Sequence, residues 1–259
     1  MDIFTNQAVN AFGAVVMVIA SIGFIVAILR IDADRRIYYA PGLFVVLSLF
    51  VSYLLGANDL FVLESSDGGD VLGLPSFINY LLSWTVMMCY ITYLAGVREY
   101  RYYLAIIAGT SAIVLGTVLA WVLDPPITFV FLLLHLIATI MLTVLAYGPI
   151  SKVGADQTGE LTLLFGKLRN LFIMTLLITS TIGYTGHGAL GLLDRFTGSA
   201  AGVYIELVSH IGFAAILFRS HDAIDDLIER RESLATSPPE EPPSPEDAIE
   251  PEGTPEPAD

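Results

Sequence analysis

Seven apolar stretches, each long enough to cross a bilayer as a helix, constrain this chain more than any other feature of its sequence. A hydrocarbon core of about 30 Å needs about 20 apolar residues in a helix. A window of that length selects residues 9–29, 38–56, 77–96, 102–123, 127–147, 168–187 and 198–218. Only helices and closed barrels satisfy their backbone groups in lipid. The sequence therefore predicts an all-α membrane protein built as a seven-transmembrane-helix bundle.

The composition agrees with this prediction, because 55% of the residues are hydrophobic and only 15% are charged, too apolar for a soluble domain of this size. The first apolar stretch lacks a positively charged leader and is longer than a signal-peptide core, so we expect it to remain as a helix. Cys89 is the sole cysteine, which excludes an internal disulfide and a cysteine-based metal site. No phosphate-binding glycine loop and no basic nucleic-acid patch is present.

The distribution of basic residues predicts the orientation of the bundle. Eleven of the 12 Lys and Arg residues lie in the loops after spans one, three, five and seven, and the alternate loops carry only Arg195. The positive-inside rule then places the N-terminus outside and the C-terminus in the cytoplasm of a multi-pass protein of the cell membrane. Residues 57–75, between spans two and three, form an acidic outer loop long enough for a small hairpin.

The C-terminal segment differs in composition from the rest of the chain. Residues 222–259 hold 13 of the 26 acids against Arg230 and Arg231, and the segment also carries eight of the 13 prolines. With few large apolar residues it cannot bury enough surface to offset the entropy of ordering. We therefore expect a membrane domain over residues 1–220 and a disordered tail over 221–259. The tail is either a solvating segment or a docking segment for a cytoplasmic partner, and its acidity fits a halophile.

Two ionisable residues interrupt the seventh span, Glu206 and His210. His210 lies nine residues before Arg219, about 13 Å from the end of the helix and near the bilayer centre. A charge at that depth costs roughly 2.5 to 3.5 kcal/mol. The four-residue spacing keeps both side chains on one helix face, so we expect them to pair, either as an ion pair or as a neutral hydrogen-bonded pair.

The seventh span also carries a family resemblance. "SHIGFAAILFRS" at 209–220 resembles the last helix of the microbial rhodopsins, above all the haloarchaeal bacteriorhodopsin group. "DADRRIYYA" at 32–40, "LGTVLAWVL" at 115–123 and "FGKLRN" at 165–170 resemble other parts of that family in the same order, and Trp84 falls on its third-helix tryptophan. The resemblance covers roughly residues 9–220 and implies the rhodopsin fold and a haloarchaeal source.

The resemblance places His210 where the family has the lysine that forms the Schiff base with retinal. The two lysines of this chain, Lys152 and Lys167, lie in the predicted cytoplasmic loop between spans five and six. An imidazole cannot condense with an aldehyde to form a stable aldimine, since that reaction needs a primary amine. The comparison therefore implies a protein without covalent retinal attachment, in which the remaining cofactor candidates are noncovalent retinal, carotenoid or lipid.

Other positions of the family's photochemical site are altered as well. Glu206 falls on the seventh-helix aspartate counterion, whereas the proton acceptor, the third-helix arginine and the proton donor fall on Ser83, Tyr80 and Leu94. The sixth-helix positions that shape the retinal pocket fall on Leu176, Thr179, Ser180 and Gly183. A proton relay needs titratable groups along its path, and few remain. Small residues opposite Trp84 permit either a void or close helix packing.

We name Glu206, His210, Ser83, Trp84, Tyr80 and Thr179 as the candidate polar or ligand site inside the bundle. The pair at its centre either satisfies itself within the bundle or anchors a noncovalent ligand or a pH-sensitive element. We expect no catalytic residue, no metal site, because His135 is the only other histidine within the spans, and no enzyme activity.

Three functions follow from this reading. The first is an opsin-fold module that binds a partner, a lipid, a carotenoid or a retinoid, in a homo-oligomer or a hetero-oligomer. The second is a light sensor or light-driven transporter with noncovalent retinal or with a lysine-bearing rhodopsin as its partner. The third, an enzyme with Glu206 and His210 as acid and base, lacks a nucleophile or metal cluster beside them.

Overall fold

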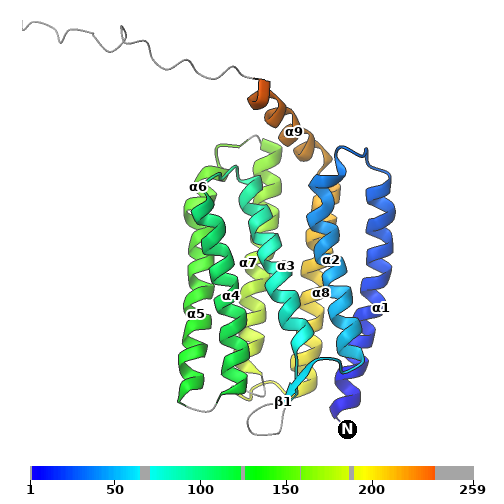
Figure 1. Cartoon of the computed structure of the whole chain (residues 1–259), viewed down its shortest axis with the longest axis vertical. Helices are drawn as coiled ribbons and strands as arrows, with labels where there is room; N and C mark the ends of the chain where they lie inside the picture. The colour runs from blue at the N-terminus through cyan, green and yellow to red at the C-terminus, as the bar shows by residue number, and fades with distance from the viewer. Residues whose placement is uncertain (1, 65–70, 124–125, 158, 187–189, 237–259) are drawn as a thin grey trace, which may run out of the picture.

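Seven long helices run up and down through a single bundle in the computed structural model, which describes residues 2–64, 71–123, 126–157, 159–186 and 190–236 (Figure 1). They are α1 (Asp2–Leu29), α2 (Arg36–Ala57), α3 (Leu74–Leu94), α4 (Tyr100–Val122), α5 (Ile127–Leu145), α7 (Gly159–Thr185) and α8 (Arg195–Arg219). All seven are long and apolar enough to cross a membrane. The predicted seven-span, all-α fold is confirmed.

Three short elements complete the bundle. The strands β1 (Val62–Glu64) and β2 (Val71–Gly73) pair antiparallel, with Leu63 opposite Leu72, so the hairpin expected between spans two and three is present. At the other end of the bundle, α5 continues through the π-helix η1 (Ala146–Ile150) into α6 (Ser151–Gly154). Pro149 lies inside η1. Proline lacks the N–H of a regular turn, and single π-turns inside helices accommodate such interruptions.

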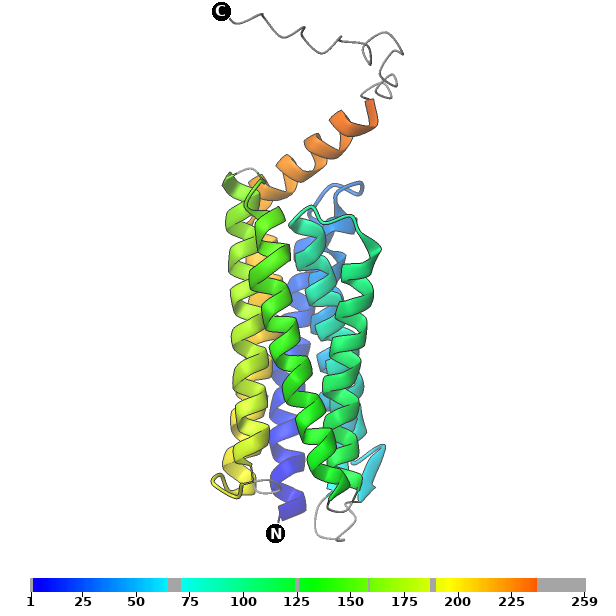
Figure 2. The same cartoon turned by 90° about the vertical axis from the view of Figure 1, so that its left-hand side faces the viewer.

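The helix α9 (His221–Thr236) corrects the prediction of disorder over residues 221–259. Only Ser220 separates it from α8, and it leaves the bundle at an angle (Figure 2). Ala223 and Ile224 are buried, and Leu227 and Ile228 pack against the same core. These four residues form one apolar face, and burial of that face against the bundle stabilises the helix. The prolines begin only after Thr236, and residues 237–259 lie outside the described part of the chain.

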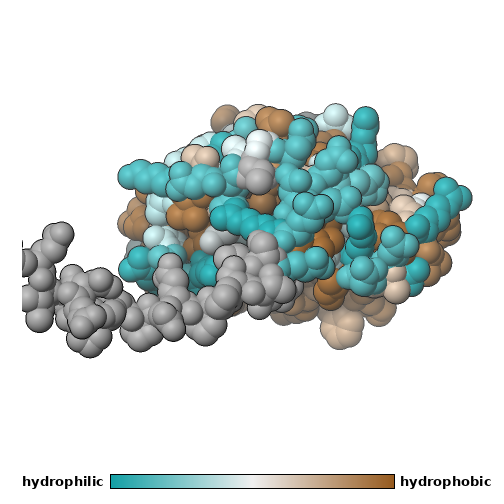
Figure 3. Space-filling view, turned by 90° about the horizontal axis from the view of Figure 1, so that it is seen from above, coloured by the Kyte–Doolittle hydropathy of each residue, from teal (hydrophilic) through white to brown (hydrophobic). Residues whose placement is uncertain are grey.

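The two ends of the bundle differ in chemistry. The N-terminus and the β hairpin lie at one end, here called the N-terminal end, and α9 lies at the other, the α9 end (Figure 1). Viewed from above, hydrophilic residues cover much of the α9 end, and hydrophobic residues appear mainly around its rim (Figure 3). The sides of the bundle expose large apolar residues on α1, α4, α5 and α7. This pattern fits a protein surrounded by lipid with polar ends in water.

Close packing between helices depends on two glycines. A Cβ atom at Gly116 of α4 would lie 3.0 Å from the carbonyl oxygen of Phe131 in α5. A Cβ at Gly42 of α2 would lie 3.3 Å from the Cα of Ala214 in α8. Small residues at such crossings let the backbones approach, which is a main source of helix association in membranes. The second contact holds α2 against α8, the helix that carries Glu206 and His210.

Candidate functional site

The carboxylate of Glu206 is held by two tyrosines from other helices. Glu206 lies on α8 and is only 6% exposed. The hydroxyl of Tyr53, on α2, donates to Oε2 at 2.7 Å, and the hydroxyl of Tyr80, on α3, donates to Oε1. A buried polar group is costly unless it is hydrogen-bonded. Both carboxylate oxygens therefore have a donor, and three helices are joined at this point.

His210 lies one turn further along α8 and is 0% exposed. Its Nδ1 atom is 2.9 Å from the carbonyl oxygen of Glu206, and its Nε2 atom is 3.1 Å from Oγ of Ser83 on α3. A carbonyl oxygen only accepts, so Nδ1 carries the hydrogen in this arrangement, and Nε2 is left as the acceptor of the neutral ring. The ring therefore makes its hydrogen bonds entirely within the bundle.

The expected side-chain pair between Glu206 and His210 is wrong, because the carboxylate of Glu206 binds Tyr53 and Tyr80 instead. Side chains on a helix lean toward its N-terminus. The Glu206 carboxylate therefore lies away from His210, while the imidazole reaches back to the Glu206 carbonyl. The four-residue spacing does place both side chains on the inner face of α8.

Besides Tyr53, three residues that the sequence analysis did not select complete this network, namely Ser48, Asn79 and Ser209. Asn79 of α3 places Nδ2 3.5 Å from Nε2 of His210, and its own Oδ1 accepts from Ser48 of α2. Ser83 lies within 2.7 Å of the Asn79 carbonyl, so its single hydrogen serves either that carbonyl or His210. Ser209 Oγ contacts both Nδ1 of His210 and the Glu206 carbonyl at 3.0 Å. Polar residues within apolar spans were the only sequence signal for this set.

The other two predicted residues make different contacts. Trp84 is buried and packs against the ring of Tyr80, with centroids 4.8 Å apart, so it supports the Glu206 side of the network. The hydroxyl of Thr179 on α7 is buried without a hydrogen-bond partner. Its expected help to the Glu206 and His210 pair is absent. The adjacent Ser180 instead lies 3.0 Å from Nε2 of His135, whose Nδ1 is 2.8 Å from Thr117.

The space around His210 is filled by protein. His210, Ser83 and Leu176 are each 0% exposed, which leaves no room for a water molecule against their side chains. Met87 and Trp84 are nearly as completely buried. No water-sized space therefore borders the His210 ring. Of the two alternatives for the small residues opposite Trp84, void or close packing, Gly183 does not show close packing, since a Cβ atom there would meet no atom within 4 Å.

The fold matches solved rhodopsins. The chain superimposes on the crystal structure of thermophilic rhodopsin from Rubrobacter xylanophilus with a TM-score of 0.79, over 86% of this chain and 98% of that one, at 15% identity. The light-driven proton pump rhodopsin of Coccomyxa subellipsoidea gives a TM-score of 0.76, over 84% of this chain and 97% of that one, at 12% identity.

The amino-acid sequence is also similar to that of a known rhodopsin. Bacteriorhodopsin of Haloterrigena sp. (strain arg-4) is 23% identical over 199 residues, which are 75% of this chain and 79% of that protein. No protein-family profile matches the chain. The chain is a microbial-rhodopsin-fold membrane protein.

Among the described residues of this rhodopsin-fold protein, no lysine amine lies beside the network. Lys152 lies on α6 and Lys167 on α7, both toward the α9 end, and both are exposed. The α8 helix contains no lysine. Among the residues that the structure describes, no group of three His, Cys, Asp or Glu side chains lies together as a metal site would require.

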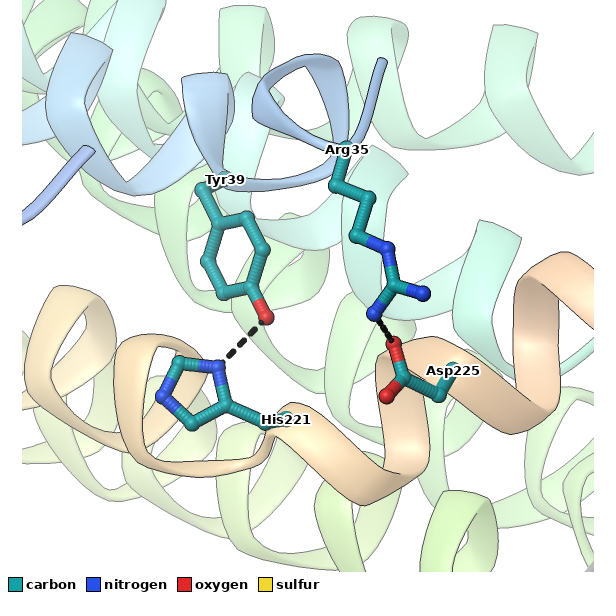
Figure 4. Close-up of polar contacts among 4 residues, drawn as sticks. All are labelled: Arg35, Tyr39, His221 and Asp225. Carbon is teal, nitrogen blue, oxygen red and sulfur yellow. Dashed lines mark hydrogen bonds and ion pairs between the residues drawn. The ribbon is translucent and has the colours of Figure 1, made fainter. Parts of the chain in front are cut away.

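A second polar cluster joins α9 to α2 at the α9 end (Figure 4). Arg35 forms an ion pair with Asp225, and the hydroxyl of Tyr39 lies 2.9 Å from Nδ1 of His221. The hydrogen bond to Asp225 and its negative charge raise the pKa of Arg35. Arg230 of α9 also donates to Gln157, which donates to the carbonyl of Ala95 at 2.9 Å. These contacts fix α9 on the end of the bundle.

Proposed function

We propose that this protein is an opsin-fold membrane protein that forms no covalent retinal Schiff base and acts as an interaction module, not as a light-driven pump by itself. The observation that carries the proposal is His210. It takes the position of the Schiff-base lysine in the family resemblance, and both of its ring nitrogens contact protein groups. The rhodopsin family implies retinal as cofactor, so loss of the attachment residue removes the shared chemistry while the fold remains.

The filled interior supports an interaction role over a noncovalent retinoid site beside His210. A preformed ligand site is a concave space lined by apolar groups and a few polar ones. His210 and its partner Ser83, both 0% exposed, border no such space. We therefore place function on the surface of the bundle and on its α9 end, with other membrane proteins as partners and with no enzymatic activity.

We also propose that the α9 end faces the cytoplasm of a cell-membrane protein. Arg35, Arg98, Lys152 and Arg219 are among the basic residues on or beside the connections at that end, and Arg195 begins α8 at the other. Basic residues concentrate on the cytoplasmic side of membrane proteins. Protease digestion of oriented vesicles tests this point, because cleavage after α9 must require access to the cytoplasmic face.

An absorption spectrum tests the chromophore part of the proposal. The protein is expressed with all-trans retinal, purified and treated with hydroxylamine, beside a His210→Lys variant. We expect no absorption band shifted from free retinal in the native protein. A shifted native band that survives purification would overturn the proposal and favour a light sensor or transporter with noncovalent retinal. A band only in His210→Lys would support it, because the missing amine alone then explains the loss.

Crosslinking in native membranes tests the partner part of the proposal. If the native chain is crosslinked to another membrane protein in intact membranes, and if this product disappears when the membranes are solubilised before crosslinking, the result would support an interaction role. If that partner is a lysine-bearing rhodopsin, the mixed oligomer becomes the functional unit, and light response belongs to the partner. Absence of any crosslinked protein would contradict the interaction role.

A further inference from the structure

An arginine on the side of the bundle, Arg169 of α7, is held in a fixed position by aromatic rings. Its guanidinium carbon lies 4.4 Å from the ring centroid of Tyr147 in η1 and 5.2 Å from that of Phe165 in α7. Such contacts position a planar guanidinium more firmly than a flexible ammonium group. The cation therefore sits against the junction between η1 and α7, toward the α9 end.

Hydrogen bonds orient the same group. Nε and Nη2 both donate to Oδ1 of Asn170, at 3.2 and 3.0 Å, and Nη1 donates to Oγ of Ser151. Tyr147 donates to the same Asn170 oxygen at 3.1 Å. A guanidinium has five N–H donors, of which these bonds use three. One N–H on each terminal nitrogen therefore remains available, and two such donors match the two oxygens of a phosphate group.

The charge of Arg169 has no protein counterion among the described residues. By contrast, Arg35 has Asp225 as its counterion, and Arg101 has Glu99. The groups that contact the Arg169 guanidinium are two rings, an amide oxygen and a hydroxyl, all uncharged. An arginine close to hydrocarbon is costly without an anion or water beside it. An anion or water must therefore lie beside this guanidinium.

An apolar strip leads along the helix to this arginine. Ile140 and Val144 of α5 and Tyr147 of η1 follow one another at three- and four-residue spacing, and they are 54%, 61% and 46% exposed. Residues at that spacing share a helix face. The strip suits an acyl chain, and the guanidinium at its end suits the headgroup phosphate. A free phosphate ion would use only the second feature.

We propose that Arg169 binds the headgroup phosphate of an anionic phospholipid, whose acyl chain lies along the strip Ile140, Val144 and Tyr147. Ser151 and Asn170 orient the guanidinium, and the exposed Lys152, next to Ser151 in sequence, adds positive charge to the same region. Basic sites between helices at a membrane surface are typical of anionic lipid recognition.

The test measures lipid binding to the full chain in detergent by native mass spectrometry. The probes are phosphatidylglycerol, phosphatidylcholine and inorganic phosphate. We expect one phosphatidylglycerol to bind about tenfold more weakly to Arg169→Gln than to the native protein. Arg169→Lys keeps the charge but loses the two directed N–H groups, so we expect an intermediate affinity. Inorganic phosphate should not displace the lipid.

Arg101→Gln is the matched control. Arg101 also contacts an aromatic ring, that of Tyr102 at 5.1 Å, but it faces Glu99 as its counterion. Its replacement should leave phosphatidylglycerol affinity unchanged. Equal loss in both Gln variants, equal affinity for phosphatidylcholine, or displacement by inorganic phosphate would each overturn the lipid site. If Arg169→Gln does not fold, the native and Arg169→Lys affinities decide by the same comparison.

Discussion

The network around Glu206 and the cluster around Arg35 each join helices through a carboxylate and a tyrosine. The first lies buried inside the bundle, and the second lies partly exposed at its end. Glu206 is nearly completely buried, and each carboxylate oxygen has one phenol donor. The Arg35 and Asp225 side chains are both roughly 40% exposed. A buried group that loses its partner stays unsatisfied, whereas an exposed one finds water. The first site therefore governs the stability of the bundle, and the second governs only the position of α9.

Removal of the shared acceptor should have the largest effect. We expect Glu206→Ala to lower the free energy of unfolding by about 2 to 3 kcal/mol, because the buried phenol of Tyr53 and the partly buried phenol of Tyr80 lose their main acceptor. Reversible unfolding in bicelles measures the change. Glu206→Gln keeps one acceptor oxygen and should lose less. Equal stability of Glu206→Ala and the native protein would show that the tyrosines find other partners.

Removal of one phenol should have a smaller effect. We expect Tyr53→Phe and Tyr80→Phe each to cost about 0.6 kcal/mol, the average for interhelical hydrogen bonds in a membrane protein, and at most about 1.7 kcal/mol. Because both phenols bind one carboxylate, the double variant should not equal the sum of the single changes. Strict additivity in that double-mutant cycle would mean that the two bonds act independently.

Removal of the exposed ion pair should leave global unfolding unchanged. Asp225→Asn should instead increase amide hydrogen exchange within α9, because Arg35 no longer holds that helix. High salt should produce the same change in the native protein, since it screens exposed charges. Asp222→Asn, on the same helix, is the control. Faster exchange throughout the bundle would contradict the separation between the two regions.

The smallest effect concerns the N-cap of α8. Asp194 accepts from the amide and the hydroxyl of Thr197, and these bonds lower the pKa of Asp194. Because the pKa of Asp194 is lower in the folded state, its carboxylate stabilises the helix end fully at pH values above its ordinary pKa of about 3.9. This stabilisation is lost as the pH falls through the pKa of the folded state. The protection factor of the Thr197 amide, which is its exchange rate relative to the intrinsic rate at the same pH, should therefore fall in acid. Asp194→Asn should remove this pH dependence, and a persisting one would exclude the cap as its cause.

The same contrast between buried and exposed regions explains what could be predicted from sequence. A long apolar segment in lipid must satisfy its own backbone hydrogen bonds, and a helix does so within one segment. All seven spans could therefore be predicted from the length of the apolar runs. The sixth span was predicted over 168–187, whereas α7 begins at Gly159. The prediction began too late because the first turns of α7 carry polar residues, such as Glu160 and Lys167, which lower the hydropathy of that stretch. The α9 helix was missed since the acids and later prolines obscured the spacing of Ala223, Ile224, Leu227 and Ile228.

The candidate site was predicted in part, because Tyr80 and Ser83 of α3 do contact Glu206 and His210, whereas Thr179 does not. The spacing of Glu206 and His210 indicated one inner face, but it could not show that Tyr53, 153 residues earlier, supplies a hydrogen bond. Such partners depend on which helices lie side by side and how each is rotated. The direction of the Glu206 side chain, toward the start of α8, also decided against its pairing with His210.

The π-helix η1 sets the direction in which the side chains of α6, the short helix that continues from it, point. A π-turn holds one more residue than an α-turn, so the segment after it is rotated by about 100°, one residue's share of a turn. Ser151 directly follows η1 and faces Arg169. Closing η1 into regular α-helical turns without a deletion would turn Ser151 away from Arg169 by about 100°. Deletion of one residue within 146–150 would remove the surplus residue together with the wide turn, so Ser151 would still face α7.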